Sequence, residues 1–215
     1  MNARGVLRLG LLAACAATAT SAMAAAPIVG DAKNGATVAT ACQACHGAQG
    51  EGIYAAGFPR LAGQTAVYLE KQLNDYASGT RANPVMAPLA KGLSAQQRAD
   101  VAAHFAGLSP PSAAPNTAGD ANAIARGRVL GRQGDESKQL QACGNCHGPE
   151  GRGEAFAAPY LAGQSATYIT SVIKEWKSGA RKNDAGQLMA VVANRLDDAD
   201  IAAVAAYFES VGPLP

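Results

Sequence analysis

The sequence has few of the bulky side chains that usually fill a protein core. Only 5% of its 215 residues are aromatic, whereas 50 are alanine, about half of an apolar fraction of 48%. Small domains already bury a smaller share of their surface than large ones do, and alanine adds little apolar area to what they bury. The composition therefore predicts that a large apolar group, absent from the polypeptide, completes the core.

Strong net charge and long hydrophobic runs are also missing. The formal net charge is +2, which excludes the strongly basic surface of a typical nucleic-acid-binding protein. No segment approaches the ~20 consecutive apolar residues that cross a membrane as a helix. With 16% charged residues, the composition is that of a globular chain and not of a disordered or fibrous one. We expect no nucleic-acid partner and no membrane span, while peripheral association with a membrane stays open.

The first 24 residues have the three parts of a secretory signal peptide. Arg4 and Arg8 precede an apolar run over 9–19, and an Ala-x-Ala site over 22–24 predicts cleavage after Ala24. The mature chain would then carry 16 basic and 16 acidic residues and would be exported. Residues 12–15 offer an alternative, because they resemble a lipoprotein processing site that would leave a lipidated Cys15 at the N-terminus.

The rest of the chain contains one unit twice, at a spacing of about 100 residues, which is typical of tandem domains. The segment CQACHGAQGEG at 42–52 matches CGNCHGPEGRG at 143–153, and PRLAGQ at 59–64 matches PYLAGQ at 159–164. A proline-rich stretch separates the two copies. We predict a signal peptide over 1–24, a first domain over 25–108, a linker over 109–122 and a second domain over 123–215.

Each copy carries helix signals and no alternating strand pattern, which predicts an all-α fold. The N-cap residue types and C-cap glycines of one helix per copy are Thr65 with Gly79, and Ser165 with Gly179. A final helix follows a capping pair in each copy, Ser94 with Gln97, and Asp197 with Asp200. We expect three to four short helices per domain, with Phe105 and Phe208 on the buried faces of the final ones.

The motif Cys-x-x-Cys-His occurs once in each copy and carries the most specific chemistry of the sequence. Two thiols one helical turn apart match thioether bonds to the two vinyl groups of a haem, and the adjacent histidine then reaches the iron. A thioredoxin-like dithiol would need a βαβ context, and a zinc site would need all four thiols in one place. We therefore predict two covalently bound haem c groups, attached through Cys42, Cys45, Cys143 and Cys146, with His46 and His147 as iron ligands.

The methionines expected in the mature chain match the haem motifs in number and in place. Met1 and Met23 leave with the signal peptide, while Met86 and Met189 follow the motif histidines by 40 and 42 residues. A single methionine is most often a flexible core residue, but this match favours ligation of both irons. A thioether ligand raises the reduction potential. We expect His104, the remaining histidine, to be an ordinary residue of the first domain's final helix.

These motifs resemble those of class I cytochromes c, and their tandem arrangement resembles the dihaem cytochrome c4 family over essentially the whole mature chain. The resemblance implies two cytochrome c domains, each wrapped around one covalently bound haem, in a periplasmic electron carrier that often serves a terminal oxidase. It also implies that the carbonyls of Pro59 and Pro159 accept the Nδ1 proton of the motif histidines. Arg81 and Arg181 are candidates for pairing with haem propionates, and a solvated surface position is an equally good interpretation of both.

The function predicted is electron transfer without catalysis, between a respiratory donor and a terminal acceptor such as a haem-copper oxidase. A methionine on each iron would leave no open position for a substrate, which disfavours the alternative of a dihaem peroxidase. A second alternative stays open, in which the chain is the electron-transfer subunit of a periplasmic dehydrogenase complex. The two haems should titrate separately, because Tyr54 and Phe58 in the first domain are replaced by Ala155 and Phe156 in the second.

Overall fold

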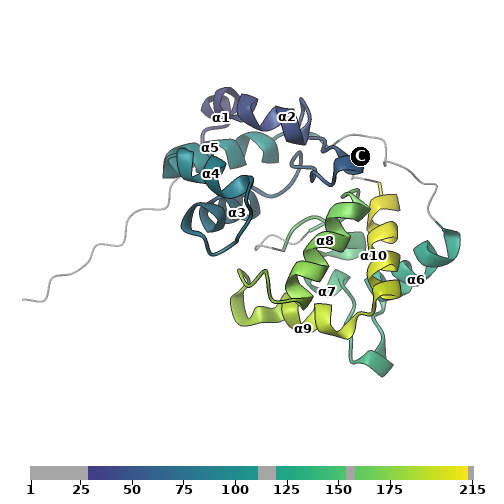
Figure 1. The fold of residues 1–215 in the computed structure, drawn as a ribbon. Helices are drawn as coiled ribbons and strands as arrows, with labels where there is room; N and C mark the ends of the chain where they lie inside the picture. The colour runs from purple at the N-terminus through teal and green to yellow at the C-terminus, as the bar shows by residue number, and fades with distance from the viewer. Residues whose placement is uncertain (1–28, 111–119, 154–157, 213–215) are drawn as a thin grey trace, which may run out of the picture.

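The computed structural model describes residues 29–110, 120–153 and 158–212. Over these ranges the fold is helical. Isolated antiparallel β-bridges pair Ile53 with Phe58 and Asp135 with Leu140. Helices α1–α5 and α6–α10 form two lobes (Figure 1), which confirms the predicted all-α class. The predictions for residues 1–24 with Cys15, for the linker interior and for Ala155 and Phe156 fall outside the described residues.

Each lobe holds five described α-helices, more than the three to four expected. The first contains α1 (Ala32–Val38), η1 (Ala39–Cys42), α2 (Gln43–His46), η2 (Tyr54–Ala56), α3 (Ala66–Ser78), α4 (Met86–Gly92) and α5 (Ala95–Ala106). The second contains α6 (Ala121–Arg132), η3 (Glu136–Lys138), α7 (Gly144–His147), η4 (Pro149–Gly151), α8 (Ala166–Lys177), η5 (Ala185–Gln187), α9 (Leu188–Arg195) and α10 (Asp198–Ser210). Helix α6 begins two residues before the predicted start of the second domain. Among the described helices, none has the length and apolar composition needed to cross a membrane.

The predicted helix caps are present. The side chains of Thr65, Ser165, Ser94 and Asp197 each accept a hydrogen bond from the backbone N–H three residues further on. At Ser94 the side chain of Gln97 completes a capping box, whereas the Asp200 carboxylate accepts from Arg126 at 3.0 Å. Gly79 caps α3 in the left-handed conformation, and Gly179 follows the C-cap of α8 by one residue.

Each domain has its own hydrophobic cluster, and the first is small. Among the described residues, the second cluster contains twelve buried residues, including Trp176, Ile201 and Phe208. The first contains five, which are Ala39, Leu69, Val101, Ala102 and Phe105. Phe105 and Phe208 are 2% and 1% exposed, which confirms their predicted burial. The small first cluster agrees with the inference that a large group from outside the polypeptide completes the core.

A glycine lets the first and last helices of each domain cross in close contact. Helix α1 packs on α5, and α6 packs on α10. A Cβ atom on Gly35 would lie 2.0 Å from the backbone oxygen of Asp100, and one on Gly127 would lie 2.1 Å from that of Ala203. A side chain at either position would separate the helices, so the crossings explain why α1 and α6 carry glycine at these positions.

The two domains contact each other through the repeated Pro-x-Leu-Ala-Gly-Gln segments. The side-chain amide of Gln64 donates to the Tyr160 carbonyl at 3.2 Å and accepts from the Tyr160 N–H at 2.9 Å. Gln164 pairs in the same way with the backbone of Arg60, at 3.1 Å and 2.9 Å. The exchange is reciprocal, so the interface has approximate twofold symmetry that follows the internal repeat.

Candidate haem sites

Each Cys-x-x-Cys-His motif lies on a short helical segment that ends at its histidine. Helix α2 ends at His46 and α7 ends at His147, and the following glycines, Gly47 and Gly148, have φ values of 84° and 74°. Glycine adopts such positive φ angles without steric cost, so the chain turns away directly after the histidine. Cysteines three residues apart on a helical turn share one side of it, as the predicted attachment to a haem requires.

The four motif cysteines are free thiols in the polypeptide. Burial raises the pKa of Cys42, and it raises the pKa of Cys143 to about 11. No disulfide joins the described cysteines, so both pairs fit thioether attachment to a haem.

Both motif histidines are buried and held by a proline carbonyl. His46 Nδ1 lies 2.8 Å from the oxygen of Pro59, and His147 Nδ1 lies 3.0 Å from that of Pro159, which confirms the expected contacts. Because a carbonyl can only accept, Nδ1 carries the proton and Nε2 keeps its lone pair. Burial also lowers the pKa of both histidines, so each ring is neutral at neutral pH, the form that binds a metal ion.

The two methionines lie at equivalent places, each at the start of a helix. Met86 is the first residue of α4 and its N–H donates to Asn83 Oδ1 at 2.9 Å. Met189 is the second residue of α9, and its N–H donates to Asp184 Oδ2 at 2.7 Å. The short η5 turn occupies the longer connection before Met189, so the backbone of both methionines is held despite the different spacing.

The donor set of each domain fits a covalently bound haem. Each offers two thiols on one helical turn, a neutral histidine with Nε2 free of a proton, and a thioether from a different helix. Within the described residues, no group of three or more His, Cys, Asp or Glu side chains forms a metal site of its own. The predicted attachment residues and ligands are thus consistent with iron held inside a porphyrin.

Arg81 and Arg181 are buried, so the solvated position that the sequence left open is wrong. Their exposed fractions are 4% and 5%. Each guanidinium stacks on an aromatic ring of its own domain, Arg81 on Tyr76 at 4.7 Å and Arg181 on Trp176 at 4.5 Å. Stacking against an aromatic face stabilises the cation where water is excluded.

The two arginines meet in an interdomain cluster. Arg81 donates to the Tyr168 hydroxyl and Arg181 to the Tyr68 hydroxyl, both at 3.3 Å and both across the interface. Gln72 accepts from the two guanidinium groups at 2.9 Å and 3.0 Å. The Glu175 carboxylate, which is 36% exposed, lies 3.9 Å from Arg81. Two buried guanidinium groups beside one partly exposed carboxylate can accommodate a further anionic group. Haem propionates have the chemistry that this cluster favours.

His104 packs inside the first domain, where α5 crosses α1. It belongs to α5 beside Phe105, with ring centroids 5.1 Å apart, and its Cβ would be 2.9 Å from a Cβ on Gly35 at the crossing with α1. These contacts give it a packing role, as expected.

The sequence did not predict the roles of Gln64, Gln164 and Gln72 at the domain interface. For Gln64 and Gln164, their repetition in the two Pro-x-Leu-Ala-Gly-Gln segments was a signal that could have revealed them.

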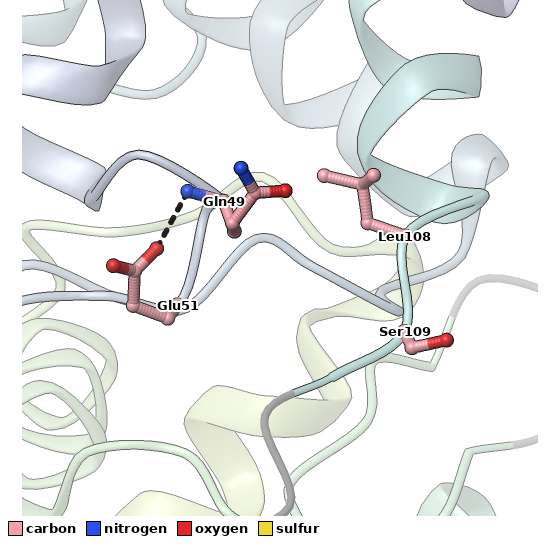
Figure 2. A pocket seen from close by; sticks show the side chains of 4 residues that line it. All are labelled: Gln49, Glu51, Leu108 and Ser109. Atoms are coloured by element: carbon pink, nitrogen blue, oxygen red, sulfur yellow. Dashed lines mark hydrogen bonds between the residues drawn. The ribbon is translucent and has the colours of Figure 1, made fainter.

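A pocket of about 430 Å³ lies next to the loop that follows the first motif. Figure 2 shows its lining, which consists of Gln49 and Glu51 from that loop and of Leu108 and Ser109, which follow α5. The Glu51 carboxylate accepts from the Gln49 N–H at 2.7 Å, which closes the loop on itself. The predicted haem ligands do not line this pocket.

The fold and the two motifs define a class of protein: paired helical domains that each carry one Cys-x-x-Cys-His motif for haem attachment. A family model described as Cytochrome c matches residues 32–109 and 134–212. The chain belongs to the cytochrome c family and, within it, to the tandem dihaem cytochromes c4. It binds two covalent haem c groups and is a dihaem electron carrier.

Three comparisons describe its similarity to known proteins. It is 43% identical over 174 residues to a thiosulfate dehydrogenase electron acceptor of Stutzerimonas stutzeri, which covers 81% of this chain and 80% of the relative. The crystal structure of reduced cytochrome c4 from Pseudomonas stutzeri matches with a TM-score of 0.79 and 33% identity, over 85% of this chain and 100% of that one. A thiosulfate dehydrogenase from Marichromatium purpuratum matches with a TM-score of 0.76 and 36% identity, over 84% of this chain and 40% of that one.

Proposed function

We propose that this chain is a periplasmic electron carrier that accepts electrons from a thiosulfate dehydrogenase and passes them to a terminal acceptor. The observation that carries the choice of donor is the 43% identity to a protein described as a thiosulfate dehydrogenase electron acceptor. A haem-copper oxidase is the candidate acceptor, because the cytochrome c4 resemblance implies one. The predicted signal peptide over 1–24 accounts for the export of the chain.

The haem, when bound, supplies a one-electron couple between ferric and ferrous iron. The chain's own residues would attach and hold it. Cys42, Cys45, Cys143 and Cys146 would form the thioether bonds, and His46 with Met86 and His147 with Met189 would bind the two irons. Two protein ligands for each iron would exclude substrates, and the chain would then carry electrons without catalysis.

The interdomain cluster supports transfer between the two sites. Arg81 and Arg181 place their buried guanidinium groups at the interface, where they would hold the propionates. Lys71 Nζ donates across the interface to the Asn183 carbonyl at 2.6 Å, and Tyr54 donates to the Gly163 carbonyl at 2.5 Å. These contacts fix the orientation of one domain against the other. The two haem sites would therefore keep a constant relative position, which favours electron transfer between them.

Reduction by thiosulfate should require the dehydrogenase. We expect the oxidised carrier to stay oxidised with thiosulfate alone, and both haems to be reduced once a catalytic amount of thiosulfate dehydrogenase is added. Anaerobic stopped-flow absorbance measures the rate, and ascorbate reduction of the same sample serves as the control. Reduction by ascorbate without reduction by the dehydrogenase would overturn the proposed donor and leave the carrier function intact.

Permanent attachment to a dehydrogenase is the second candidate, favoured by the match to part of a thiosulfate dehydrogenase chain. Size-exclusion chromatography of native periplasmic extract separates the two candidates. A free carrier elutes at the size of one chain, whereas a permanent subunit elutes together with its catalytic partner.

A further inference from the structure

One peptide group in each domain connects the motif histidine to the opposite domain. In the first domain it is the peptide between Pro59 and Arg60. Its carbonyl accepts the Nδ1 proton of His46 at 2.8 Å, while its N–H donates to Gln164 Oε1 of the second domain at 2.9 Å. The histidine of one domain and the glutamine of the other are therefore bound to the two ends of a single amide.

The second domain repeats this arrangement. The carbonyl of the peptide between Pro159 and Tyr160 accepts from His147 Nδ1 at 3.0 Å, and its N–H donates to Gln64 Oε1 of the first domain at 2.9 Å. Arg60 and Tyr160 differ in side chain, but the backbone N–H of each donates to the equivalent glutamine of the opposite domain. The repetition indicates a feature of the architecture and not of one local contact.

The hydrogen-bonding pattern fixes the orientation of both glutamine amides. Gln164 Oε1 also accepts from the N–H of Ser165 at 3.0 Å, while its Nε2 donates to the Arg60 carbonyl. Gln64 Oε1 also accepts from the N–H of Thr65, at 3.1 Å. An oxygen that faces two N–H groups cannot be exchanged with the amide nitrogen. Both side chains are 4% exposed, so water does not compete for these bonds.

We propose that each glutamine lowers the reduction potential of the haem in the other domain, Gln164 acting on the first haem and Gln64 on the second. The peptide is a conjugated unit, so an acceptor on its N–H increases the electron density on its carbonyl. A stronger carbonyl acceptor draws the Nδ1 proton and makes the histidine a more basic ligand. A more basic ligand stabilises ferric iron. The inference rests on the proposed assignment of His46 and His147 as ligands.

The proposal makes the domain interface a determinant of both potentials. Gln64 and Gln164 are positioning residues, since each acts on an iron through a histidine that it does not touch. A glutamine that only supported its own loop would affect the haem of its own domain. A glutamine that only joined the domains would affect both haems alike. Cross-domain selectivity therefore separates the proposal from a purely structural role.

The reciprocal variants Gln164→Leu and Gln64→Leu test it in the holoprotein. A redox titration followed by NMR, with haem methyl signals assigned to each domain, gives the two potentials separately. Gln164→Leu should favour reduction of the first haem about threefold, roughly 30 mV at 59 mV per tenfold, and leave the second unchanged. Gln64→Leu should do the reverse. The His Nδ1 proton of the affected haem should shift upfield in the reduced protein as its hydrogen bond weakens.

Two further variants control for loosening of the interface. Gln164→Glu keeps an acceptor on the Arg60 N–H and loses the donor to the Arg60 carbonyl, so the potential of the first haem should not rise. Lys71→Met removes a different interdomain hydrogen bond, to the Asn183 carbonyl, and should raise the potential of neither haem. Both variants lose the interdomain donor, so a rise of the potential in the Leu variant alone does not arise from loosening of the interface.

The proposal is overturned if each leucine variant shifts the haem of its own domain, shifts both haems equally, or shifts neither while both stay low-spin. The same outcome follows if Lys71→Met reproduces the rise seen with Gln164→Leu. The absence of two low-spin haems in the unmodified protein would overturn the ligand assignment itself, which is a distinguishable result.

Discussion

Replacing Met189 with alanine should remove the protein ligand from the sixth position of the second iron and leave the first iron unchanged. The potential of the second haem should fall by a sizeable part of the roughly 0.8 V range that axial ligands span, because a thioether favours ferrous iron. The weak sulfur-to-iron band near the red end of the visible spectrum should lose about half its intensity. The reduced variant should bind carbon monoxide at one haem of two.

The Met86→Ala variant is the matched control, with the same result expected at the first haem. Both variants keep the side chain that accepts from the backbone N–H of the substituted residue, Asn83 for position 86 and Asp184 for position 189. The helix should therefore still begin at the same place. Ultraviolet-visible spectra with carbon monoxide titration read out both. If Met86→Ala leaves the band and the potential unchanged, another group, such as His104, is the ligand.

The double variant Cys42→Ser with Cys45→Ser should carry one haem and have an unfolded first domain. Removing a single Phe or Trp side chain from a core costs about 3–5 kcal/mol, and a haem is considerably larger. Whole domains are stable by only about 5–15 kcal/mol. The first domain has little else to bury, since two of the five residues in its cluster are alanines. Intact-mass analysis and hydrogen exchange of residues 32–109 measure haem content and folding.

The equivalent change, Cys143→Ser with Cys146→Ser, is the comparison. The second cluster contains Trp176, Ile173 and ten further residues, so the second domain should retain more protected amides without its haem than the first does. Amide protection over 32–109 equal to that of the unmodified protein would show that the haem does not complete the core. The inference from composition would then be wrong.

The parts of the fold that the sequence predicted depend on local patterns. The caps at Thr65 and Ser94 are read from residues three positions apart, and the burial of Phe105 follows from the period of one helix. The motif histidines and their proline carbonyls lie 13 and 12 residues apart, so each pair belongs to one domain. The family resemblance implied both contacts. Short-range patterns of this kind need no knowledge of the other domain.

The parts that the sequence did not predict depend on contacts between the domains. Arg81 and Arg181 look like ordinary surface cations in the sequence, and their burial requires Tyr168 and Tyr68 from the opposite lobe. The role of Gln64 depends on Tyr160, 96 residues further along the chain.

A potentiometric titration of the unmodified holoprotein, combined with carbon monoxide and peroxide additions, tests the central claim most directly. Two haems with the ligand pairs His46/Met86 and His147/Met189, in domains with different surroundings, should give two one-electron waves. The reduced protein should bind no carbon monoxide and consume no peroxide. Rapid peroxide consumption, or a five-coordinate high-spin signal from either haem, would contradict the account and identify the chain as an enzyme with an open iron site.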